Sequence, residues 1–295
     1  MAQQINLVLS GGGARGIAHI GIIEILEQEG YEIAAIAGTS MGGLVGGLYA
    51  AHALEAYKNW LIHADLKEAV RMLDFSLKLP GLIKGDKIMR KINQMLKIKK
   101  IEDLDMPYTA VATDLTHYEE VNFTQGKLIE AMRATISIPT IFTPVYKDDK
   151  MLVDGGLLNN IPINHLPDNG LPIIAVCANA EVPMTPPLIK IMKGDQKKES
   201  EYLKKLKGIQ QHIERFMKVK PPKNNNNKPG YTEILDEALH LMIAQRSNQI
   251  IAQNPPDLLI NIPRKLAGTL DFLKADKIYQ AGLYLGEKAL KTNIR

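Results

Sequence analysis

The chain has 295 residues, of which 45% are hydrophobic and 23% are charged, which is typical of a globular protein with a sizeable core. Its single cysteine, Cys177, excludes an intramolecular disulfide and a cysteine-based zinc site, and its apolar surroundings predict a buried, inert thiol. The net charge is +4, but residues 185–230 alone hold 12 Lys and Arg against 4 Asp and Glu, so the remainder is net acidic.

The first residues are a poor match to a signal peptide and are too interrupted to predict a membrane span. Residues 1–4 contain no basic side chain, and glycines, Arg15 and His19 interrupt the apolar stretch that follows. We therefore expect a cytoplasmic protein.

The first part of the chain predicts a parallel α/β sheet. An apolar run at 5–9 leads into a glycine-rich turn and a helical pattern that Gly30 ends. A second apolar run at 33–37 leads into a turn of small residues at 38–42 and a second helix. Strand, glycine-rich turn and helix, twice in succession, are typical of this fold class.

Later segments extend the pattern. We expect, in chain order, helices within 54–100, strands at 108–113 and 120–123, a helix at 127–135, a short strand at 151–153, a central strand at 173–178, a helix at 232–252, a strand at 258–262 and a last helix to about 291. Residues 183–230, rich in Pro, Lys and Asn, read as an insertion around one helix. The prediction is one domain over 1–295, a three-layer α/β/α sandwich with a mixed, largely parallel sheet, closed by a helix-strand-helix unit at 231–295.

The first candidate site is the turn formed by Gly11, Gly12, Gly13, Ala14, Arg15 and Gly16. It follows a strand and opens a helix, so backbone N–H groups and the helix dipole converge on one point and favour an anion, either a phosphate or an oxyanion. The turn also fits the dinucleotide pattern G-x-G-x-x-G. That pattern needs an acidic residue after the next strand, and the next strand ends instead at Gly38-Thr39-Ser40.

The second candidate is Ser40, in the sequence Gly38-Thr39-Ser40-Met41-Gly42. A serine on a tight turn between a strand and a helix projects its hydroxyl clear of the backbone, and the flanking Gly38 and Gly42 relieve the crowding. This placement predicts a nucleophile.

A nucleophilic serine needs a base. None of the seven histidines has a triad-like setting, since His240, the one late candidate, lies inside a helical run; the seven are His19, His52, His63, His117, His165, His212 and His240. Asp154 is the better base, because it ends a short strand, as Ser40 does, and Gly155 and Gly156 permit close approach. A plain Asp-Gly turn is the alternative.

These three motifs, in this order, resemble the patatin-like phospholipase family. Similar stretches are found at 133–139, 157–162 and 256–263, so the resemblance covers nearly the whole chain except about 183–230. The resemblance implies a lipid acyl hydrolase that cleaves carboxylic esters of phospholipids or related lipids, with Ser40 as nucleophile, Asp154 as base and the turn at 11–16 as oxyanion hole. It implies neither a metal nor an organic cofactor.

Several alternatives stay open. Arg15 either adds charge near the intermediate or a lipid phosphate, or has a surface or structural salt-bridge role. Other functions that fit are a serine hydrolase that recruits a histidine, and a non-catalytic lipid-binding or regulatory module with the same fold. In residues 201–217 a basic amphipathic helix is compatible with an anionic membrane surface, but packing on the domain or on a second copy of the chain is the favoured interpretation. No nucleic-acid partner is expected.

Overall fold

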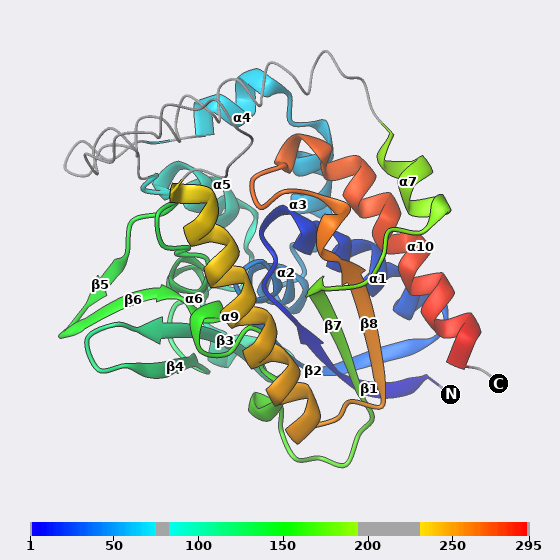
Figure 1. The fold of residues 1–295 in the computed structure, drawn as a ribbon. Coiled ribbons are helices and arrows are strands. Elements are labelled where there is room, and N and C mark those ends of the chain that lie inside the picture. Colours follow the sequence, from blue (N-terminus) through cyan, green and yellow to red (C-terminus); the bar gives the residue numbers. More distant parts are fainter. Residues whose placement is uncertain (1, 73, 75–82, 194–230, 294–295) are drawn as a thin grey trace.

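The computed structural model describes residues 2–72, 74, 83–193 and 231–293 (Figure 1). In these residues one mixed sheet has the strand order β5-β6-β3-β2-β1-β7-β8, and β4 pairs with β3. The strands are β1 (Gln3–Leu9), β2 (Tyr31–Thr39), β3 (Tyr108–Asp114), β4 (Glu119–Phe123), β5 (Val145–Lys147), β6 (Lys150–Asp154), β7 (Ile173–Ala180) and β8 (Leu258–Pro263). The pairs among β3, β2, β1, β7 and β8 are parallel, whereas β4, β5 and β6 join through antiparallel pairs.

Helices cover both faces of the sheet. Side chains alternate between the two faces along each strand, and apolar side chains on both faces need to be buried. In β1, for example, Leu7 and Leu9 point into the larger core, while Val8 points into a smaller core that includes Ile250 of α9. The helices are α1 (Ala18–Gln28), α2 (Met41–Ala50), α3 (Leu54–His63), α4 (Leu66–Met72), α5 (Asp86–Met95), α6 (Leu128–Thr135), α7 (Pro186–Met192), α9 (Tyr231–Gln253) and α10 (Ala275–Asn293). The predicted three-layer α/β/α fold with a largely parallel sheet is confirmed.

The C-terminal elements pack directly on the N-terminal ones. Helix α10 crosses α1 so closely that a Cβ atom on Gly21 or Gly282 would overlap the backbone of the other helix. Strand β8 adds to the sheet beside β7, which places β7 between β1 and β8 (Figure 1). The last helix and strand therefore share the core of the first βα units.

Two elements were not predicted. The short strand β5 extends the antiparallel edge beside β6, where three residues are too few for a periodic pattern. Helix α7 lies at the start of the basic segment, and its Leu188 is buried in the larger core. The expected amphipathic helix at 201–217 lies outside the described residues and stays a prediction. No helix in the described part of the chain has the length and apolar character needed to cross a membrane.

Candidate functional site

Ser40 occupies a sharp turn between β2 and α2. Its backbone angles, φ 54° and ψ −127°, are unusual for a residue with a side chain, and they set its hydroxyl apart from the strand and the helix. Such a conformation persists only where the surrounding structure enforces it.

The glycines on either side of Ser40 permit this turn. A Cβ atom on Gly42 would overlap the carbonyl of Leu9 at the end of β1, and one on Gly38 would overlap the backbone of Gly42. The start of α2 thus sits directly on the end of β1, at the carboxyl edge of the parallel strands. The glycine spacing noted in the sequence therefore has a steric cause.

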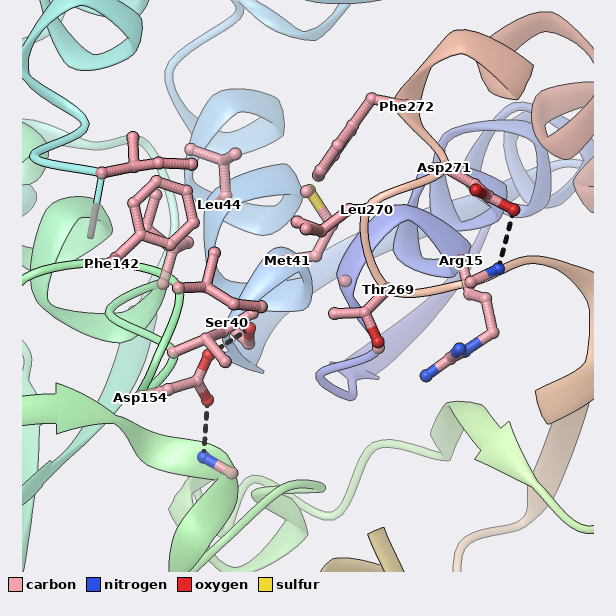
Figure 2. A pocket seen from close by; sticks show the side chains of 18 of the residues that line it. Arg15, Ser40, Met41, Leu44, Phe142, Asp154, Thr269, Leu270, Asp271 and Phe272 are labelled. Carbon is pink, nitrogen blue, oxygen red and sulfur yellow. Dashed lines mark hydrogen bonds between the residues drawn. The ribbon is translucent and has the colours of Figure 1, made fainter. Parts of the chain in front are cut away.

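The structure brings Asp154 to Ser40. Asp154 ends β6, which pairs with β3, and Ser40 Oγ donates a hydrogen bond to Asp154 Oδ2. The other carboxylate oxygen accepts the N–H of Gly156 at 2.8 Å. Figure 2 shows the two side chains pointing toward each other at one wall of a pocket.

The carboxylate of Asp154 is shielded from water, since only 6% of the residue is exposed, as is 4% of Ser40. Burial disfavours the charged form and raises the pKa of Asp154 to about 6, although the hydrogen bonds from Ser40 and Gly156 oppose the rise. A carboxyl group with this pKa is a stronger base than an exposed aspartate and is ionised at neutral pH.

The last residue of α6 and the segment that follows it hold both groups in place, which sequence reasoning missed. Thr135 Oγ1 accepts the backbone N–H of Ser40 at 2.8 Å and donates to the carbonyl of Val111. The carbonyl of Ser137 accepts the N–H of Asp154 at 3.0 Å. The stretch 133–139 stood out in the sequence only through the family resemblance, and nothing local to it indicated these contacts.

The glycine-rich turn lies beside Ser40, and its N–H groups differ in their partners. Gly11 donates to the carbonyl of Asn160 at 3.0 Å, and Ala14 donates to the carbonyl of Thr269 at 2.9 Å. The N–H groups of Gly12 and Gly13 have no hydrogen-bond acceptor among the described residues. Of the six residues singled out at 11–16, these two carry the donors that remain available at the pocket.

Arg15 points into the protein. It is 3% exposed, and its guanidinium donates to the carbonyls of Ala178 and Ala267 at 3.0 and 2.8 Å and to Asn179 Oδ1 at 2.6 Å. Burial lowers the pKa of Arg15 to about 10. The side chain of Arg15 thus has a structural position. Its partners are neutral oxygens, whereas the sequence suggested a salt bridge.

A cavity of about 600 Å³ opens at Ser40 and Asp154. Its size falls within the range of small-molecule sites, and its walls are mostly apolar. Met41, Leu44 and Phe142 lie around the serine (Figure 2). Three side chains of α9 close another wall, namely Leu235, Leu239 and Ile243.

The histidines make no hydrogen bond to Ser40 or Asp154 in the described part of the chain. His240 lines the cavity but pairs with Asp236 at 3.4 Å. His19 is fully buried with Nε2 2.9 Å from the carbonyl of Ser10, and burial lowers its pKa to about 4. His19 therefore stays neutral and helps to fix the start of the glycine turn.

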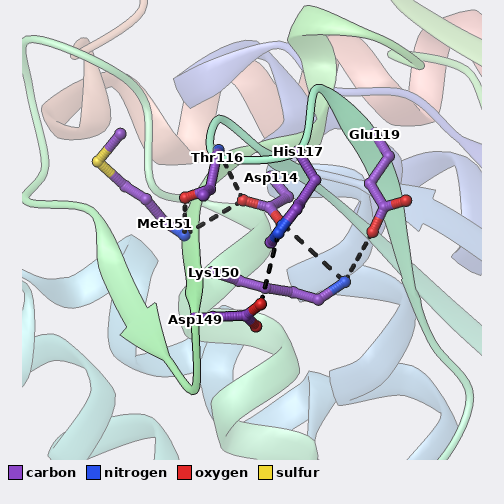
Figure 3. Close-up of polar contacts among 7 residues, drawn as sticks. All are labelled: Asp114, Thr116, His117, Glu119, Asp149, Lys150 and Met151. Atoms are coloured by element: carbon purple, nitrogen blue, oxygen red, sulfur yellow. Dashed lines mark hydrogen bonds and ion pairs between the residues drawn. The ribbon is translucent and has the colours of Figure 1, made fainter.

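One cluster brings metal-ligating side chains together away from the cavity. Ligand atoms of Asp114, His117 and Glu119 lie within 4.8 Å of one another. The ammonium of Lys150 already lies 2.7 Å from Glu119 and 4.0 Å from Asp114, and Asp114 also pairs with His117 at 2.6 Å (Figure 3). These contacts form an ion-pair network that links β3, β4 and β6. The ammonium of Lys150 supplies positive charge to the carboxylates of this cluster.

The chain is similar in sequence to proteins of one family. A family model described as patatin-like phospholipase matches residues 7–167. An uncharacterized NTE family protein of Mycobacterium bovis is 30% identical to the chain, over 98% of the chain and 92% of that protein.

Fungal relatives are much longer. Proteins named lysophospholipase NTE1, from Kluyveromyces lactis and Saccharomyces cerevisiae, are each 28% identical over 98% and 96% of the chain. The chain spans only 19% and 16% of their lengths. Among solved structures, VipD from Legionella pneumophila is similar with a TM-score of 0.46 and 13% identity, over 98% of the chain and 67% of VipD.

Proposed function

The chain belongs to the patatin-like phospholipase family and is an ester-hydrolysing enzyme, and from this premise we propose that it hydrolyses acyl lipids through Ser40 and Asp154. The observation that carries the proposal is the hydrogen bond from Ser40 Oγ to a buried carboxylate with a raised pKa. A serine hydroxyl next to a base is the arrangement that nucleophilic catalysis requires.

The first half of the reaction transfers the acyl group to the enzyme. Ser40 Oγ attacks the ester carbonyl carbon while Asp154 takes the hydroxyl proton. The carbonyl oxygen becomes an oxyanion, and we propose that the N–H groups of Gly12 and Gly13 stabilise it. When the intermediate collapses, the bond to the alcohol oxygen breaks and Asp154 returns its proton to the leaving alcohol.

The second half releases the acid. Water attacks the carbonyl of the acyl-serine while Asp154 accepts one of its protons, and a second oxyanion forms at the same N–H groups. Cleavage of the ester to Ser40 frees the fatty acid, and the proton on Asp154 returns to Ser40 Oγ. These steps use Ser40, Asp154 and the N–H groups of Gly12 and Gly13.

The cavity supports a lipid as the substrate. Its apolar walls match an acyl chain, which would lie against Leu44, Phe142 and the inner side of α9. The fungal relatives carry the name lysophospholipase, which agrees with this class. We propose that the ester carbonyl lies at Ser40 with the acyl chain extending into the cavity.

Labelling with a fluorophosphonate probe tests the proposal. The probe should attach to the wild-type protein and fail to attach to a Ser40→Ala variant, because phosphonylation needs an activated serine. A thermal unfolding curve of the variant checks that it is folded. A folded wild-type protein that neither labels nor hydrolyses vesicle or micellar phospholipid would contradict the proposal and favour the non-catalytic lipid-binding module.

Two further variants separate Asp154 from a histidine as the base. Asp154→Asn should abolish turnover, whereas His240→Ala should retain most of it, since His240 makes no hydrogen bond to Ser40 among the described residues. Turnover that survives in Asp154→Asn and vanishes in His240→Ala would assign the base to histidine.

A further inference from the structure

The glycine turn beside Ser40 is fixed by a chain of buried hydrogen bonds that begins at Arg15. Arg15 Nη2 donates to Asn179 Oδ1 at 2.6 Å, and Asn179 Nδ2 donates to the carbonyl of Gly11 at 3.2 Å. Asn179 comes from the end of β7 and is only 8% exposed. This series of hydrogen bonds therefore connects Asn179 to the carbonyl of Gly11, which lies more than 160 residues earlier in the sequence.

The orientation of the Asn179 amide follows from its partners. A guanidinium has only donors, so the amide atom that faces Arg15 must be the oxygen. The amide nitrogen then faces the carbonyl of Gly11, which can only accept. Arg15 thus sets the direction in which Asn179 donates.

The carbonyl of Gly11 in turn determines where the next N–H group points. The peptide bonds of the described chain are trans, and in a trans peptide the C=O and the following N–H point in opposite directions. Holding the oxygen of Gly11 toward Asn179 therefore turns the N–H of Gly12 away from Asn179. Gly12, whose N–H has no acceptor among the described residues, lines the cavity together with Ser40.

Two other donors reach the same oxygen. Ser10 Oγ lies 3.1 Å and Asn160 Nδ2 lies 3.5 Å from the carbonyl oxygen of Gly11. Ser10 Oγ is itself held by the N–H of Ala178 at 2.7 Å. Without Asn179 the carbonyl would thus keep partial support, which limits the effect expected from a single substitution.

We propose that Asn179 is a positioning residue that orients the Gly11–Gly12 peptide so that the N–H of Gly12 meets the oxyanion, with Arg15 holding Asn179 in place. This inference rests on the proposed function. The inference explains why a charged side chain is buried at Arg15. A charged donor that is held by three acceptors fixes the amide of Asn179 more firmly than a neutral side chain would. Asn179 acts through the peptide and does not itself touch the reacting atoms.

Asn179→Asp is the sharpest test. The substitution keeps the size of the side chain and its partnership with Arg15, but it replaces the donor to Gly11 with a carboxylate oxygen that repels the carbonyl. Removing an oxyanion donor outright costs roughly 100- to 1,000-fold in kcat. Since Gly12 keeps its N–H and only loses its orientation, kcat should fall about 10- to 100-fold, with KM changed less than threefold.

A pair of inhibitors isolates the oxyanion contribution. Ser40 Oγ adds to the carbonyl carbon of a trifluoromethyl ketone that carries a fatty acyl chain, and the adduct holds an oxyanion. The amide with the same acyl chain binds without forming this adduct. Asn179→Asp should weaken the fluoroketone by a factor similar to the loss in kcat and leave the amide unchanged. Asn6→Asp is the matched control, because Asn6 is also buried in the sheet but lies in the middle of β1, where its side chain bonds to Asn169.

The outcomes are separable. If wild-type protein lacks esterase activity, the proposed function itself fails. If wild type is active and Asn179→Asp retains its kcat and fluoroketone affinity, or loses affinity for both inhibitors equally, the positioning role is wrong. Should Asn179→Asp not fold, Asn179→Ala removes the same donor without adding charge, and the same two readouts decide.

Discussion

The hydroxyl of Ser40 donates its hydrogen bond to Asp154 in a setting that hides both side chains from water. The pair joins the end of a parallel strand, β2, to the end of an antiparallel strand, β6. Because Ser40 bonds to Asp154 directly, no imidazole lies between the two side chains, and in the proposed mechanism the carboxylate itself receives the serine proton.

The pH profile should report the pKa of Asp154. As a base the carboxyl group acts only when ionised, so kcat/KM should rise with pH, reach half its plateau at about pH 6 and fall tenfold per pH unit below that. The measurement uses a soluble, uncharged ester, so that lipid packing does not change with pH. An inflection near 4, the ordinary value for aspartate, would show that burial does not perturb this carboxyl group.

Asp154→Asn should inactivate the protein and also stabilise it. Because the pKa of Asp154 is higher in the folded state than its ordinary value of 3.8, ionisation costs stability as pH rises from about 4 to 6, and the full cost is present above that. A rise to about 6 corresponds to about 2–3 kcal/mol.

Urea unfolding at pH 8 and at pH 4 measures this effect. The Asn variant should exceed the wild type in stability at pH 8, and the difference should shrink at pH 4, because there Asp154 is protonated in the folded state and close to its ordinary pKa of 3.8 in the unfolded state. Equal differences at both pH values would mean that the ionisation of Asp154 is not the source of the gain.

Gly42→Ala should destabilise the fold strongly. The added methyl group would overlap the carbonyl of Leu9, and neither the strand nor the start of α2 can shift without disturbing the Ser40 turn. Overpacking of this kind costs about 1–3 kcal/mol or more. Gly268→Ala is the control, since its methyl group would meet only Asp271 at 3.4 Å and the residue is exposed. Similar melting temperatures for the two variants would contradict the steric account.

Thr135→Val should lower both stability and kcat. The substitution keeps the shape of the side chain but leaves the N–H of Ser40 without its acceptor and the carbonyl of Val111 without its donor, at a cost of about 1–3 kcal/mol. Thr135→Ser retains the hydroxyl and should restore most of the activity. Equal kcat values for the Val and Ser variants would show that the hydroxyl does not hold the nucleophile.

The sequence by itself predicted most of the elements in their order, and it singled out Ser40 and Asp154 as the proposed catalytic pair. Alternating apolar runs and glycine-rich turns are local patterns, so they predicted β1, β2 and the helices that follow them within a few residues. The glycines around Ser40 form a pattern of five residues, so they could be recognised locally, although the contact that requires Gly42 is with Leu9 at the end of β1. Asp154 was identified as a strand end, and the carboxyl ends of adjacent strands meet at one edge of a sheet.

The tertiary structure decided everything that depends on distant partners. Which N–H groups of the glycine turn remain available depends on Asn160 and Thr269, and the inward position of Arg15 depends on Ala178, Asn179 and Ala267. Thr135 and Asn179 carry no local signature, since a lone threonine or asparagine occurs in many settings. Their contacts exist only because the parallel strands bring segments from across the chain to one edge of the sheet, where burial makes each hydrogen bond costly to lose.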